Sequence, residues 1–206
     1  MEKSISITKE QLAALPTETF PGKISVIETE EEALAALSYL NGCSIVGFDT
    51  ETKPTFRKGR TNTVALIQVS TLEHSFLFRL NKIGLIDPLR EFIENPSVVK
   101  VGLSLKDDFF VLHRINDFIP EGFIDLQQFV KRYNIVDCSL QRIYGIIFNR
   151  RISKSQRLSN WEAAQLSAPQ QVYASIDAWA CLRIYRYLTE GRFDPACSPY
   201  IVEVAQ

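Results

Sequence analysis

The chain has 206 residues, a formal net charge of −1, 46 % hydrophobic residues and 23 % charged residues. This length fits one ordinary domain with short additions, and the composition excludes wholesale disorder and a collagen-like repeat. The apolar runs are far shorter than the roughly 18 residues of a membrane-spanning helix. The charged N-terminus does not resemble a secretory signal, and no pair of the four cysteines has zinc-like spacing. We therefore expect a cytoplasmic protein with reduced thiols and no membrane partner.

The order of the predicted elements indicates a mixed α/β sheet covered by helices. A capping box at Thr29 and Glu32 marks the start of one helix, and a short polar turn between two apolar runs predicts an antiparallel hairpin. The predicted strands cover residues 23–27, 44–48, 63–70, 74–78, 98–103 and 122–126. The predicted helices cover residues 9–15, 29–40, 85–94, 105–114, 127–133, 139–148 and 168–188.

Two stretches concentrate basic residues although the net charge is close to zero. Residues 131–157 contain seven basic residues and one acidic residue, and residues 53–60 contain four basic residues and no acidic one. Such runs form either a solvated face or a footprint for a polyanion, and the composition leaves both interpretations open.

Acidic residues follow the predicted strand over 44–48. Asp49 and Glu51 are separated by Thr50, and residues two apart on a strand point to the same side. Two carboxylates held together raise each other's pKa unless a cation compensates them. The pattern therefore favours a metal site over an exposed pair in a loop.

Two predicted helices carry further acidic candidates. Asp107 and Asp108 lie near a helix start, where acids also interact favourably with the helix dipole, and the local sequence separates the two only weakly. Tyr173 and Asp177 are four residues apart on the longest predicted helix and share one face. Carboxylates without clustered His or Cys suit hard cations such as Mg²⁺ or Mn²⁺. Two such ions about 3.5–4 Å apart can hold the attacking and leaving oxygens of a phosphodiester.

Three segments taken in order resemble the motifs of the DnaQ-like 3′–5′ exonucleases. They are VGFDTET (46–52), VGLSLKDDFFVL (101–112) and LSNWEAAQLSAPQQVYASIDAWACLRIY (158–185). A tyrosine four residues before the last aspartate resembles the DEDDy branch, which includes ribonuclease D and the Werner-helicase exonuclease domain. The chain departs from many relatives at AAQLS (163–167), where they carry an Arg-Pro pair.

The resemblance implies an RNase H-like fold, with a mixed sheet of about five strands flanked by helices. The implied 3′–5′ exonuclease domain spans residues 23–192, between an N-terminal extension over 1–22 and a C-terminal tail over 193–206. The motif register favours Asp108 over Asp107. The implied ligands of two Mg²⁺ or Mn²⁺ ions are Asp49, Glu51, Asp108 and Asp177, and Tyr173 is implied to orient the attacking water.

The implied reaction hydrolyses terminal phosphodiester bonds at a single-stranded 3′ end of DNA or RNA and releases nucleoside 5′-monophosphates. The residues expected to contact the nucleic acid are Phe56, Arg57, Lys58, Lys154 and Arg157. Two alternatives remain: a non-catalytic nucleic-acid-binding module on the same fold, and a two-metal phosphodiesterase acting on small molecules or oligoribonucleotides. The presence of all four acids and the tyrosine favours the exonuclease. The choice between DNA and RNA stays open.

Overall fold

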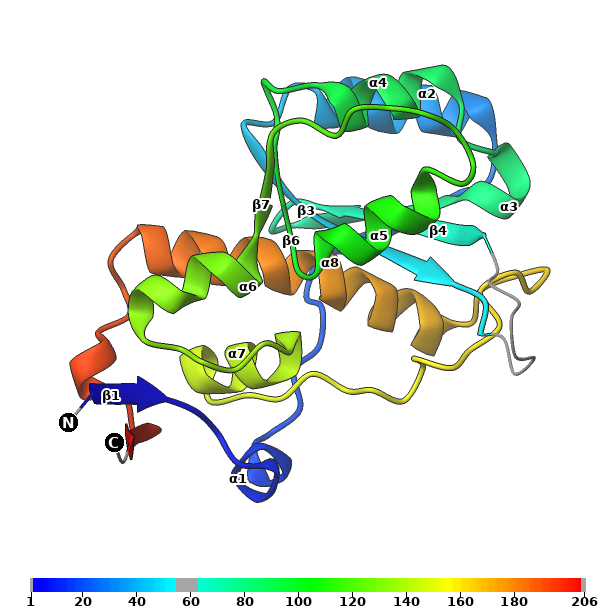
Figure 1. Cartoon of the computed structure of the whole chain (residues 1–206). Helices are drawn as coiled ribbons and strands as arrows, with labels where there is room; N and C mark the ends of the chain where they lie inside the picture. Colours follow the sequence, from blue (N-terminus) through cyan, green and yellow to red (C-terminus); the bar gives the residue numbers. More distant parts are fainter. Residues whose placement is uncertain (1, 55–62, 205–206) are drawn as a thin grey trace.

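The centre of the protein is a six-stranded mixed sheet in a computed structural model that describes residues 2–54 and 63–204 (Figure 1). The strand order is β2-β5-β4-β3-β6-β7, and β4 runs antiparallel to both of its neighbours. The strands are β2 (Lys23–Ile27), β3 (Ile45–Thr52), β4 (Val64–Ser70), β5 (His74–Arg79), β6 (Val99–Gly102) and β7 (Phe123–Asp125). The mixed α/β fold and the β4–β5 hairpin are confirmed, with six strands where about five were expected.

Helices cover both faces of this sheet (Figure 1). The α-helices are α1 (Lys9–Ala14), α2 (Glu30–Leu40), α3 (Leu80–Ile83), α4 (Asp87–Glu94), α5 (Leu105–Leu112), α6 (Leu126–Phe129), α7 (Leu140–Phe148) and α8 (Ala168–Thr189). Two 3₁₀ turns, η1 (Val130–Tyr133) and η2 (Pro195–Cys197), complete the helical elements. On one face, α2, α4 and α5 bury apolar side chains against the sheet, and α7 and α8 do so on the other. None of the helices within the described residues has the length and apolarity needed to cross a membrane.

Side-chain caps set several helix starts. The predicted capping box of α2 is present, because the Thr29 hydroxyl accepts from the Glu32 amide and the Glu32 carboxylate accepts from the Thr29 amide. Ser139 caps α7 in the same region where the sequence predicts that helix to begin. The helix predicted over 127–133 is divided into α6 and η1, and it ends at Asn134, which adopts a left-handed conformation with φ of 59°.

Helix α8 lies directly on β3 at Gly47. An added Cβ at Gly47 would lie 1.8 Å from the carbonyl oxygen of Ala178, so no larger side chain fits there. Gly47 and Asp49 point to the same face of β3, and Asp177 precedes Ala178 on α8. The close approach of strand and helix therefore brings Asp177 next to the carboxylates at the end of β3.

The two ends of the chain pair with each other. Strand β1 (Glu2–Ile5) and strand β8 (Ile201–Val204) form a separate two-stranded antiparallel sheet (Figure 1). Ile5 and Ile7 are buried in the same apolar cluster as Tyr144 of α7 and Ile184 of α8. The first and last segments are thus packed against the core on the α8 side of the central sheet.

Candidate active site

A cleft of about 510 Å³ opens at the end of β3, between α5 and α8. Its walls contain every site residue that the sequence predicts within the described ranges. These are Asp49, Glu51, Asp108, Lys154, Arg157, Tyr173 and Asp177. Phe56, Arg57 and Lys58 lie outside the residues that the structure describes.

Three carboxylates form a tight group inside this cleft. One oxygen from each of Asp49, Glu51 and Asp177 lies within 4.8 Å of the other two. Asp49 and Glu51 project from the same face of β3, next to a register irregularity between Glu51 and Thr52, and Asp177 comes from α8. A short strand segment and one helix therefore supply the whole group.

Burial and mutual repulsion shift the proton equilibria of this group. Burial, with the nearby charge of Asp177 and Asp108, raises the pKa of Glu51 to about 9. Burial also raises the pKa of Asp177 to about 7, and burial together with the neighbouring acids raises the pKa of Asp49. Each carboxyl is easier to ionise when a cation is present. The oxygen-only donors and their crowding therefore fit a hard divalent cation.

Asp108 lines the same cleft but makes a different contact. It lies in the first turn of α5, where its carboxylate accepts a hydrogen bond from the Thr50 hydroxyl. Burial raises the pKa of Asp108 to about 7, although the bond from Thr50 opposes this shift. Asp107 also borders the cleft but is exposed. The contact with β3 distinguishes Asp108 from Asp107, which the local sequence separates only weakly.

Tyr173 lies one helical turn before Asp177. Its hydroxyl donates a hydrogen bond to the Asp177 carboxylate. This bond partly offsets the rise in the pKa of Asp177 that burial causes. Burial and the surrounding acids raise the pKa of Tyr173 above its usual value near 10. The phenol therefore stays protonated at neutral pH and acts as a hydrogen-bond donor.

Two basic side chains face the acidic group from the cleft wall. Lys154 and Arg157 are both exposed. The charge of Lys154 partly offsets the rise in the pKa of Asp177, and the charge of Arg157 does the same for Glu51. The part of the basic stretch nearest to α8 thus borders the cleft. An anionic ligand entering the cleft meets these two charges beside the carboxylates.

Two buried polar residues near the site are absent from the sequence-based predictions. Gln68 is the cross-strand neighbour of Asp49, and Trp161 packs against Tyr173 with ring centroids 5.9 Å apart. Both side chains are fully buried, and among the described residues neither the Gln68 amide nor the Trp161 indole nitrogen has a hydrogen-bond partner. The available sequence signal is a polar Gln68 within the apolar run of β4.

A buried arginine holds the segment that leads into α8. Arg79 donates hydrogen bonds to the carbonyl oxygens of Ala163 and Ala164, and its guanidinium lies 2.5 Å from a Glu28 carboxylate oxygen. Its side chain is fully buried. These contacts hold residues 163–164, which lie just beyond Trp161 in the chain.

Comparison with known proteins identifies related chains. Residues 24–191 match the 3′–5′ exonuclease family. The mouse bifunctional 3′–5′ exonuclease/ATP-dependent helicase WRN is 31 % identical over 187 residues, which cover 84 % of this chain and 13 % of the mouse protein. This chain therefore spans only a small part of that relative.

Solved structures share the fold. The Nibbler EXO domain of Aedes aegypti has a TM-score of 0.74 at 24 % identity, with 87 % of this chain and 96 % of that chain covered. Ribonuclease D of Trypanosoma brucei in complex with RNA U12 has a TM-score of 0.71 at 18 % identity, with 82 % and 63 % covered. The family match extends over most of the chain and contains all five acidic and tyrosine candidates of the cleft. The chain therefore belongs to the 3′–5′ exonuclease family.

Proposed function

We propose that this protein is a metal-dependent exonuclease that removes nucleotides from a single-stranded 3′ end of DNA or RNA. The products are nucleoside 5′-monophosphates. The observation that carries this proposal is the group formed by Asp49, Glu51 and Asp177, inside a cleft that also presents basic side chains. Acidic side chains can hold the cations, and basic side chains can hold the phosphates, in a metal-dependent hydrolysis of a phosphodiester.

The carboxylates have separate tasks in this proposal. Asp49, Glu51 and Asp177 would hold one Mg²⁺ or Mn²⁺ ion, because their oxygens already lie close together. Asp108, which Thr50 holds in the wall of the same cleft, would support a second ion. When bound, the ions supply positive charge that offsets the charge of the reacting phosphate and makes a water easier to deprotonate.

Tyr173 would position the attacking water. Its protonated hydroxyl lies beside Asp177, within the wall of the cleft. A phenol with a raised pKa is a poor base at neutral pH, so its contribution is orientation by a hydrogen bond. Lys154 and Arg157 would hold the phosphates of the strand, since both are exposed and face the acidic group.

The substrate proposal is supported by the solved complex of Trypanosoma brucei ribonuclease D, which has the same fold, with RNA U12. Discrimination between DNA and RNA depends on contacts with the 2′-hydroxyl, so both are tested. Matched DNA and RNA oligonucleotides with a 5′ label are incubated with Mg²⁺ or Mn²⁺, and the product ladder is followed. We expect stepwise shortening that a bulky group on the 3′ end stops and a bulky group on the 5′ end does not.

Two controls make this test decisive. Asp49→Asn removes one carboxylate charge from the group and should abolish shortening while leaving the circular dichroism spectrum unchanged. Cleavage of a circular single strand would indicate an endonuclease and contradict the proposal. Binding of the oligonucleotides without any shortening, at all metal concentrations, would support a non-catalytic binding module instead.

A further inference from the structure

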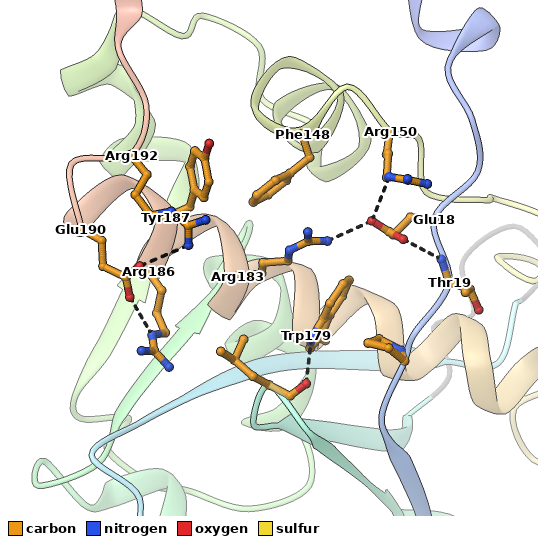
Figure 2. A pocket seen from close by; sticks show the side chains of 12 residues that line it. Glu18, Thr19, Phe148, Arg150, Trp179, Arg183, Arg186, Tyr187, Glu190 and Arg192 are labelled. Atoms are coloured by element: carbon orange, nitrogen blue, oxygen red, sulfur yellow. Dashed lines mark hydrogen bonds and ion pairs between the residues drawn. The ribbon is translucent and has the colours of Figure 1, made fainter.

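A second cavity is lined by several residues of α8 (Figure 2). It has a volume of about 610 Å³ and shares no lining residue with the cleft. Asp177 faces the cleft and Arg186 faces the cavity. Nine residues along a helix make about two and a half turns, so these two side chains point to opposite sides of α8. The cavity is therefore a separate site, and its volume lies within the range of about 300–1,000 Å³ that is typical of small-molecule sites.

The cavity wall carries more positive than negative charge. Its charged lining residues are Arg150, Arg183, Arg186, Arg192, Glu18 and Glu190. An arginine side chain keeps its charge at all ordinary pH values. Four guanidinium groups and two carboxylates leave an excess of two positive charges, which matches a phosphate monoester with a charge near −2.

Each glutamate is shared between two arginines (Figure 2). Glu18 lies 2.9 Å from Arg183 and 3.8 Å from Arg150, and Glu190 lies 3.2 Å from Arg186 and 3.5 Å from Arg192. The side chains of Arg150, Arg186 and Arg192 are 49 %, 48 % and 61 % exposed. An arginine has several N–H donors in a planar fork, so these three arginines can bind a second anion and keep their contacts with the glutamates.

Aromatic rings form the rest of the wall. The Arg183 guanidinium carbon lies 4.3 Å from the centre of the Phe148 ring and 4.8 Å from that of Trp179. Arg192 lies 4.6 Å from the centre of the Tyr187 ring, and the Phe148 and Tyr187 rings meet edge to face at 5.0 Å. Aromatic faces and guanidinium planes are the surfaces on which a nucleobase stacks.

We propose that this cavity binds a nucleotide. Arg186 and Arg192, which share Glu190, hold its phosphate, and the base lies against Phe148 and Tyr187. The same chemistry is present in a free nucleoside monophosphate and in one nucleotide unit of a strand. The binding does not depend on hydrolysis in the cleft, because the two sites share no residue.

The test measures binding of AMP, inorganic phosphate and adenosine to the full chain by calorimetry, with EDTA present so that no divalent ion is bound in the cleft. AMP should bind more tightly than either fragment, because only AMP engages both the arginines and the rings. Arg192→Ala should weaken AMP binding about tenfold, which is the effect of losing one charge-assisted contact. Arg192→Lys retains the charge but not the planar fork, and should give an intermediate affinity.

A matched control separates this effect from a general loss of charge. Arg132 is also exposed and lies 5.1 Å from the centre of the Phe129 ring, but it does not line the cavity. Arg132→Ala should leave AMP affinity unchanged. Lys154→Ala reports on any AMP that binds in the cleft, where Lys154 is proposed to hold phosphates. Thermal unfolding of each variant verifies that the fold is retained.

Competition then identifies the source of the nucleotide. If a single-stranded oligonucleotide displaces AMP, the cavity binds a strand, and if it does not, the cavity binds free nucleotides. The proposal is wrong if the parent protein does not bind AMP, if Arg132→Ala weakens binding as much as Arg192→Ala, or if only Lys154→Ala weakens it. Nuclease activity, measured separately with Mn²⁺, reports on the cleft, so failure of one proposal does not resemble failure of the other.

Discussion

The Tyr173 hydroxyl lies beside a carboxylate of the acidic group, and its contribution can be separated from that of the proposed metal ligands. Tyr173→Phe removes one hydroxyl while the ring retains its packing against Trp161. We expect a fall in kcat of roughly 10²–10³, as for the loss of one positioned group in a transition state. The Mn²⁺ concentration for half-maximal activity should change little.

Asp177→Asn is the comparison for this prediction, because it alters a member of the tight carboxylate group. It should lower the rate further and also raise the Mn²⁺ concentration that is needed. Rates measured against Mn²⁺ concentration for both variants distinguish the two effects. If Tyr173→Phe is as active as the parent, the tyrosine only packs.

Lys100 shows the opposite electrostatic situation, a buried base. It is fully buried in β6 and donates to the carbonyl oxygens of Phe92 and Asn95. Burial lowers its pKa from 10.5 to about 8. Between these values the unfolded chain binds more protons than the folded one, so this group makes the free energy of unfolding rise with pH, by up to about 3 kcal/mol.

Lys100→Met should remove that rise. The free energy of unfolding, measured in urea from pH 7.5 to 10 (about the range between the two pKa values), should increase less with pH in the variant than in the parent. The loss of the two hydrogen bonds changes the free energy of unfolding by the same amount at every pH, so it does not affect this comparison of slopes. Parallel curves for the two proteins would contradict the assignment.

At the scale of elements, the contact between β3 and α8 sets the geometry of the site. Gly47→Ala would place a Cβ 1.8 Å from the carbonyl oxygen of Ala178, so the helix has to move. We expect a loss of about 1–3 kcal/mol in stability, as for other overpacked positions, and a large loss of nuclease activity. Gly42→Ala is the matched control, because the nearest atom there is 3.3 Å away and the site is in a turn. Nuclease activity in Gly47→Ala equal to that of Gly42→Ala would contradict this role.

Local signals predicted most elements and the β4–β5 hairpin, but not the other strand pairings. The capping residues Thr29 and Ser139, and the apolar runs of β4 and β5 with the short turn between them, act within a few residues of the chain. The pairing of β1 with β8 joins segments about 200 residues apart, and neither segment alone indicates its partner. The same limit applies to strand order within the sheet.

The residues of the site also divide into those that local sequence predicts and those that depend on long-range packing. The spacing of Asp49 and Glu51 on one strand places both carboxylates on one face, and the four-residue spacing of Tyr173 and Asp177 does the same on α8. The contact of Asp108 with Thr50 depends on how α5 packs, so local sequence could not predict it. Burial of the Gln68 amide likewise follows from the assembled sheet.

At the scale of the whole molecule, the acidic group opposes folding when no cation is bound. The folded-state pKa values of Glu51, Asp108 and Asp177, which are about 9, 7 and 7, exceed their ordinary values. The folded protein therefore binds more protons than the unfolded chain from about pH 4 to pH 9. Through this range, these groups make the free energy of unfolding fall as pH rises.

Asp49→Asn relieves part of this repulsion. At about pH 8, which is above the pKa of Asp177, this carboxyl is ionised. In EDTA at this pH, the variant should unfold at a higher urea concentration than the parent. Its stability should also fall less between about pH 6 and pH 8. Added Mn²⁺ should stabilise the parent more than the variant. A variant that is less stable than the parent in EDTA at the higher pH would contradict this account.

The backbone contact at Gly47 also has a consequence for motion. At Gly47 the backbone of β3 meets the backbone of α8 directly, because the Ala178 carbonyl occupies the place of a Cβ. The strand and helix that carry the acidic group should therefore open to solvent together. In hydrogen–deuterium exchange, the amides of residues 47–50 and 175–179 should exchange at similar rates, and Mn²⁺ should slow both by a similar factor. Exchange of one segment long before the other would mean that the site is held together by its side chains alone.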